Sequence, residues 1–136
     1  MELTMTNTTL TNQNPELTKN YIIKLLDQLT IDYQNTKSER KVIAHQSSTS
    51  EEEFTVLEEI ELLTTDIRGY ASQIKATGSI DNPQEAIKEL QHKRVFDIPN
   101  ITQFYFNNSQ QYDNIKYYLQ MLDYLRLIIL EYLTIQ

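Results

Sequence analysis

Cysteine is absent from this chain of 136 residues. The protein therefore has no disulfide framework, no thiolate nucleophile and no cysteine-based zinc site, and its two histidines are a weak reservoir of metal ligands. Two glycines and three prolines leave few positions for the tight turns of a protein rich in β-hairpins. These absences favour an all-α protein with no metal and no cofactor.

Positive charge is also scarce. Twelve Lys and Arg residues stand against 19 Asp and Glu residues, which gives a formal charge of −7. This is the wrong sign for attraction to a phosphate backbone, so nucleic acid is disfavoured as a partner. The N-terminal sequence MELTMTNTTLTNQNPEL lacks the basic and apolar regions of a secretory signal. We expect a cytoplasmic protein with a flexible tail at residues 1–13 and one helical bundle domain at residues 14–136.

Helix starts are well marked. Asn14–Glu16 and Asn82–Glu85 each place an asparagine cap before a proline at the first helical position, and Ser50–Glu53 forms a capping box. Asn108–Gln111 is a weaker start of the same kind. We predict a single-domain bundle of three long helices and one short helix, over residues 15–44, 51–77, 83–94 and 109–136.

The segment 51–77 carries the clearest pattern. Its apolar residues recur at alternating spacings of four and three, with Gly78 as the stop: Val56, Ile60, Leu63, Ile67, Tyr70 and Ile74. We expect this seam to pack on the helix predicted at 15–44 in a long antiparallel hairpin, with an intermolecular coiled coil as the alternative. The facing residues in the first helix are Leu17, Tyr21, Ile22, Leu25, Leu26 and Leu29.

Residues 95–108 contain Pro99 and a group of aromatic side chains, and we expect an ordered connection with room for a helical turn after Asn100. In the helix that follows, the polar residues from Tyr117 onward fall within an arc of about 140°, which leaves about 220° apolar. Three charges in this stretch and no basic flank argue against a membrane span. The pattern predicts a central bundle helix, or one shared with a partner.

This surplus of apolar and tyrosine side chains favours a protein-protein interaction module of the adaptor, inhibitor or assembly-chaperone type. The expected partner is another protein or a second copy in a homo-oligomer, and the acidic face of residues 51–77 favours a basic partner. A structural component of a virus or phage particle is a further alternative. The residues predicted to bind the partner are Phe104, Tyr105, Phe106, Tyr117, Tyr124, Leu125, Ile128 and Tyr132.

The stretch SERKVIAHQ, residues 38–46, has two interpretations. In the first, Arg40 and its basic neighbours pair with the acidic run of the next helix, and His45 sits at a helix end where the dipole favours a cation. In the second, RKVIAH resembles the motif of HEPN-domain proteins, a helical family that includes metal-independent ribonucleases. The resemblance implies that Arg40 stabilises phosphate charge and that His45 is the general acid or base, across a dimer.

Overall fold

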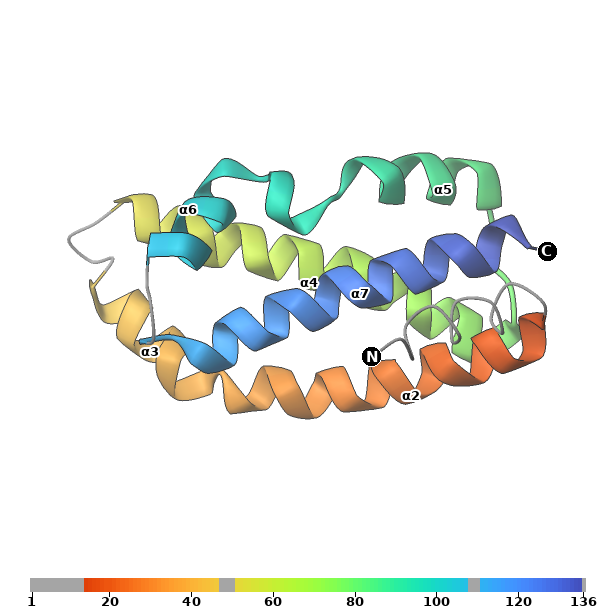
Figure 1. Ribbon diagram of the computed structural model, residues 1–136, viewed down its shortest axis with the longest axis horizontal. Helices are drawn as coiled ribbons and strands as arrows, with labels where there is room; N and C mark the ends of the chain where they lie inside the picture. Colours follow the sequence, from red (N-terminus) through yellow and green to blue (C-terminus); the bar gives the residue numbers. More distant parts are fainter. Residues whose placement is uncertain (1–13, 47–50, 108–110, 136) are drawn as a thin grey trace.

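The computed structural model describes residues 14–46, 51–107 and 111–135, and of residues 45, 46 and 51–55 it describes the backbone alone (Figure 1). The predicted tail at 1–13, the cap at Ser50 and the helix start at Ser109 lie outside the described residues. The described part of the chain is all-helical, as predicted. Its elements are α2 (Pro15–Asn35), α3 (Lys37–Gln46), α4 (Glu51–Thr77), α5 (Pro83–His92), the 3-10 helix η1 (Val95–Asp97), α6 (Pro99–Asn107) and α7 (Asp113–Thr134).

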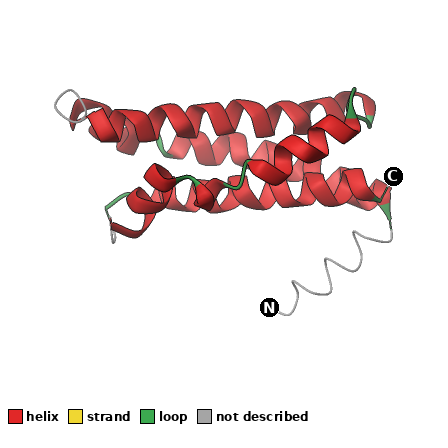
Figure 2. Cartoon of the chain, turned by 90° about the horizontal axis from the view of Figure 1, so that it is seen from above, coloured by secondary structure: helices red, strands yellow, loops and turns green. Residues whose placement is uncertain are grey.

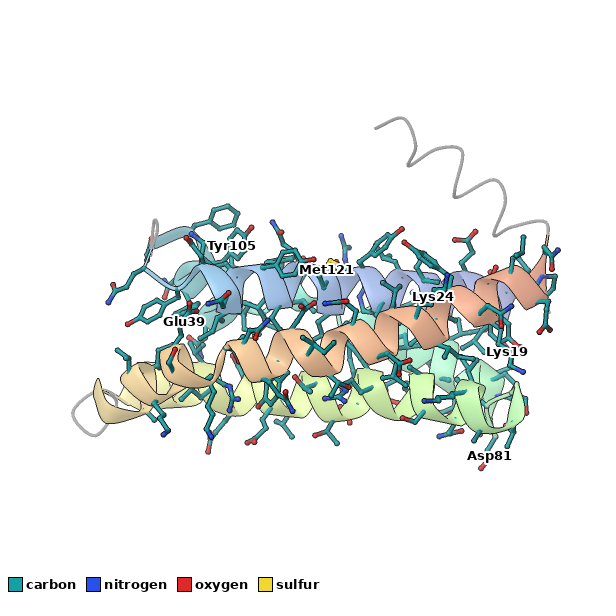
Figure 3. The ribbon with its side chains drawn as sticks, turned by 90° about the horizontal axis from the view of Figure 1, so that it is seen from below. Lys19, Lys24, Glu39, Asp81, Tyr105 and Met121 are labelled. Carbon is teal, nitrogen blue, oxygen red and sulfur yellow. The ribbon has the colours of Figure 1, made fainter. Side chains whose placement is uncertain are left out.

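The helices run along one long axis of an elongated bundle (Figures 1 and 2). α2 and α3 run in one direction, and α4 returns in the other (Figure 1). α2 packs against both α4 and α7 and covers the seam between them (Figure 3). α5, η1 and α6 lie on the opposite side of α7 and α4 (Figure 1).

The first helix begins where the sequence predicts. Asn14 Oδ1 accepts hydrogen bonds from the backbone nitrogens of Glu16 at 3.0 Å and Leu17 at 3.2 Å, and Pro15 occupies the first turn. The prediction of the apolar face is wrong for Leu17, because its side chain is 49% exposed. The other aliphatic residues of that face are buried, and Tyr21 is half-buried.

The predicted helix over 15–44 is interrupted at Thr36, which separates α2 from α3. The carbonyl of Tyr33 accepts hydrogen bonds from the Thr36 backbone at 3.1 Å and from Thr36 Oγ1 at 2.6 Å. It also accepts one from the Arg40 guanidinium at 3.4 Å. These donors engage the carbonyl that would otherwise bond to Lys37 in a continuous helix, which accounts for the break.

α4 spans Glu51–Thr77, the range that the pattern predicts, and Gly78 follows with φ +82°. This left-handed conformation is one that glycine adopts at little cost, and it ends the helix. The aliphatic residues of the heptad seam are at most 4% exposed. They belong to one hydrophobic cluster that includes residues from every α-helix described.

Residues 95–107 are more helical than the sequence indicates. η1 and α6 occupy most of this range, and α6 begins at Pro99, a favoured residue at the first helical position. Its buried side chains Ile101 and Phe104 pack in the common core. The segment is therefore part of the bundle.

α7 is central to the bundle, with α2, α4 and α5 packed around it. The wide apolar face expected of it is largely covered within the chain: among its residues Leu119, Leu122, Leu125 and Ile129 are 0% exposed. No helix in the described residues is long and apolar enough to cross a bilayer.

Candidate protein interface

A groove opens on the outer side of α7, where α5 ends and η1 begins. It has a volume of about 460 Å³. We call it the α7 groove, and its lining residues are Gln91, Arg94, Phe96, Asp97, Asp123, Arg126, Leu127 and Leu130. Phe96, Leu127 and Leu130 supply apolar surface, and two cations and two anions supply balanced charge.

The groove has a fixed polar base made by Asp123 and Arg126. Arg126 is 4% exposed; its Nε donates to Asp123 Oδ1 at 2.9 Å and its Nη1 donates to the Leu90 carbonyl at 2.9 Å. Asp123 Oδ1 also accepts the backbone N–H of Val95 at 3.2 Å. The pair thus attaches the end of α5 and the start of η1 to α7, which explains how a guanidinium is tolerated at this depth.

Aromatic rings continue the groove toward α6. The rings of Phe96 and Tyr105 meet edge to face with centroids 5.0 Å apart, and those of Tyr105 and Phe106 do so at 5.1 Å. The ammonium of Lys116 lies 5.3 Å from the Tyr105 centroid, and Gln120 Nε2 donates to the Tyr105 hydroxyl. We call Phe96, Tyr105 and Phe106 the aromatic cluster. Figure 3 shows Tyr105 near the N-terminal end of α7.

Phe106 is the most exposed of the large hydrophobic residues in the described chain, at 71%. The segment around it, from Ile98 to Tyr112, contains no Asp, Glu, Lys or Arg, and one cation, the ammonium of Lys116, lies against the neighbouring Tyr105 ring. Charge depletion combined with aromatic enrichment is the composition of the central part of protein interfaces. The aromatic cluster and the α7 groove therefore form the surface whose chemistry best fits a protein partner.

The eight residues predicted to bind a partner fall into two groups in the structure. Four are buried in the chain's own core: Phe104 at 6%, Leu125 at 0%, Ile128 at 6% and Tyr132 at 3% exposure. The bundle covers them because α7 is enclosed by other helices. Tyr105 and Tyr124 are half-buried, and Phe106 and Tyr117, 49% exposed, reach the surface.

Sequence reasoning missed the groove residues Phe96, Asp123, Arg126 and Leu127. One signal was present: Asp123 and Arg126 lie three residues apart in an otherwise apolar helix, a spacing at which opposite charges pair. The partner elements of the groove, α5 and η1, are brought to it by tertiary packing that local patterns do not specify.

Two tyrosines of α7, Tyr118 and Tyr124, form hydrogen bonds within the bundle. Tyr118 donates to Thr64 Oγ1 at 3.0 Å, and burial raises its pKa to about 12. Burial likewise raises the pKa of Tyr124 to about 12, and its hydroxyl shares a 3.2 Å hydrogen bond with that of Tyr21. Both side chains are therefore neutral near physiological pH.

Arg40 lies at the break between α2 and α3. Its guanidinium carbon is 4.0 Å from the Tyr33 ring centroid, and its Nε donates to Thr36 Oγ1 at 2.8 Å. These contacts fasten α3 to the end of α2, which is a structural use for the cation. The side chain of His45, the second residue of the HEPN-like motif, lies outside the described residues.

Glu39, next to Arg40, has a separate structural contact. Its carboxylate accepts hydrogen bonds from the backbone nitrogens of Asn114 at 3.1 Å and Ile115 at 2.9 Å. It also accepts one from Asn114 Nδ2 at 2.9 Å. Tyr112, at the cap position of α7, makes no side-chain cap hydrogen bond, so Glu39 serves as the cap from another helix.

The outward side of α4 differs in character from the α7 groove. Leu62 is 65% exposed and is bordered by exposed Glu58, Glu61 and Thr65. Nearby, burial raises the pKa of Glu59, a hydrogen bond from the Asn100 side chain opposes that change, and the charge of Glu58 adds to it. This side of the bundle is acidic, whereas the aromatic cluster is uncharged.

The chain matches no known protein-family model, and comparison with curated proteins and with solved structures gives no significant match.

Proposed function

We propose that this protein is an interaction module that binds another polypeptide through the aromatic cluster and the α7 groove. The observation that carries the proposal is Phe106, a phenylalanine 71% exposed at the end of a run of rings that reaches the α7 groove through Phe96. A large ring held in water costs free energy that burial against a partner recovers. Aromatic residues of this kind dominate the energetics of protein interfaces.

The rigidity of the surface supports the same proposal. The groove has a base fixed by the Asp123 and Arg126 contacts, and Phe104 anchors α6 in the core at 6% exposure. A preorganised surface loses less conformational entropy on binding than a mobile one. Adaptor, inhibitor and assembly-chaperone roles all require such a surface, with another protein or a second copy as the partner.

The test is site-specific photo-crosslinking in cells that express the chain. A benzophenone-bearing phenylalanine analogue replaces Phe106, and a matched control places the analogue at Ile31 of α2, which is 52% exposed. We expect a discrete cross-linked product from position 106 and none from position 31. Equal labelling at both positions, or none at either, would contradict the proposal.

A further inference from the structure

We infer that the partner at this surface is a second copy of the chain, docked about a two-fold axis so that Arg94 and Asp97 exchange ion-pair partners between copies. The inference rests on the proposed function and names the occupant of the same surface. Three features of the described residues lead to it.

The first feature is net charge. Two copies that each carry −7 repel one another unless the contact region is neutral or of mixed sign. The outward side of α4, with Glu58 and Glu61 exposed beside Leu62, would place like charges together. The rings of the aromatic cluster carry no charge and have one cation, Lys116, against Tyr105, and the α7 groove holds equal numbers of cations and anions. Self-association is therefore opposed less at this surface than on the outward side of α4.

The second feature is self-complementarity at the rim. Arg94 and Asp97 form an ion pair at 3.4 Å within the chain, and their side chains are 63% and 62% exposed. An exposed pair of this kind is held weakly and is free to exchange partners. In a two-fold contact the same patch meets itself, so each residue must find its complement in the same patch, and this pair supplies both signs.

The third feature is the apolar surface that flanks the pair. Phe96 lies between Arg94 and Asp97 in sequence and contacts Tyr105. Leu127, 48% exposed, lines the groove on the α7 side. Apolar groups inside a polar rim are the usual arrangement of a stable interface.

The experiment is sedimentation velocity on the full chain from about 1 μM to about 1 mM, a range that covers moderate to weak dimers. We expect the wild type to reach a dimer within this range. Leu127→Asp should weaken the dimer about tenfold or more, because a charge enters the apolar part of the contact. Ile31→Asp adds the same charge at a similarly exposed position on α2 and should leave the dimer unchanged.

Charge reversal then tests the two-fold arrangement. Arg94→Asp and Asp97→Arg should each weaken self-association about tenfold, since like charges meet at two symmetric positions. Asp97→Arg should weaken self-association even though it lowers the overall negative charge, which by itself would reduce the repulsion between copies. An equimolar mixture of the two variants should form a heterodimer, and the double variant should recover the homodimer.

A wild type that stays monomeric up to about 1 mM overturns the inference. So does a dimer that Ile31→Asp weakens and Leu127→Asp does not, or a mixture of the charge-reversed variants that fails to associate. These outcomes are separable from failure of the proposed function. A monomer that still forms a cross-link from position 106 to a different polypeptide retains the binding role and loses the second copy as partner.

Discussion

Glu39→Ala should destabilise the protein by detaching the start of α7 from α3. The carboxylate accepts from the backbone nitrogens of Asn114 and Ile115, the second and third residues of α7. These are the donors that a helix-capping side chain normally satisfies, and loss of such a cap costs about 1 kcal/mol. The charge of Glu39 also faces the positive end of the α7 dipole, which adds about 0.5 kcal/mol.

A third bond, from Asn114 Nδ2 at 2.9 Å, is lost in the same variant. Because the acceptor is charged and its bond from the Ile115 nitrogen is partly buried, we expect a total decrease of about 2 kcal/mol in the free energy of unfolding. Glu39→Gln keeps one acceptor oxygen, so its decrease should be about half as large. Urea denaturation followed by helical circular dichroism measures both.

The matched control is Glu16→Ala. Glu16 is an acid in the first turn of α2, as Glu39 is in the first turn of α3, so both substitutions remove a favourable helix-dipole interaction. Only Glu39 carries the bonds to α7. A difference of less than about 0.5 kcal/mol between the two alanine variants would refute the assignment of Glu39 as the cap of α7.

Four further predictions concern stability and the ribonuclease alternative. Arg126→Ala should lower the free energy of unfolding by about 3 kcal/mol in urea denaturation, because it leaves a partly buried carboxylate without its cation. Glu59→Gln should raise the urea midpoint at neutral pH and leave it unchanged below about pH 4. Because the pKa of this carboxyl is raised in the folded protein, the folded protein keeps a proton that the unfolded chain releases. Wild-type stability therefore falls as the pH rises from the pKa of the unfolded chain, about 4, through the raised pKa of the folded protein. Gly69→Ala should stabilise by about 1 kcal/mol, because the position is exposed in α4 and an added Cβ meets no atom within 4 Å, whereas Gly78→Ala should destabilise by a similar amount because its φ is +82°. Arg40→Ala should cost about 1 kcal/mol through loss of its contact with the Tyr33 ring, and wild type and variant should show the same background in an RNA-cleavage assay.

Each of these has an outcome that contradicts its reasoning. A neutral Arg126→Ala would mean that the pair does not hold α5 and η1 to α7. Parallel pH profiles for wild type and Glu59→Gln would remove the role of burial at that carboxyl. Equal effects at Gly69 and Gly78 would refute the distinction between an open helical site and a left-handed one. RNA cleavage by the wild type that Arg40→Ala abolishes would favour the HEPN-like ribonuclease.

Local signals predicted the helix starts well because capping is decided within a few residues. Asn14 and Asn82 both accept cap hydrogen bonds in the structure, and Gly78 ends α4 in the conformation that glycine favours. The break at Thr36 was missed because no glycine or proline marks it. It depends on one carbonyl that accepts from Thr36 and Arg40 together, a contact that becomes clear only in three dimensions.

The candidate site could be predicted only in part, because it also depends on contacts that form only when the helices pack. Hydrophobic patterns identify apolar side chains but not what covers them, so Leu125 and Tyr132 were expected at an interface although they lie in the core. Phe106, predicted in the same set, is 71% exposed. Arg126 was expected on the polar side of its helix, yet α5 and η1 pack over it and bury it. Burial of this kind follows from which helices meet.

The division between core and surface on α7 and α6 makes the proposed binding role experimentally separable from folding. Phe106 and Leu127 are exposed and take no part in the buried cluster, so their substitution should alter association and leave the free energy of unfolding nearly unchanged. Leu125 lies in that cluster at 0% exposure, and shortening it removes core packing at a cost of about 3 kcal/mol. Loss of binding in a Leu125 variant would therefore report unfolding. Loss of binding in a Phe106 or Leu127 variant that remains as stable as the wild type would report the interface itself.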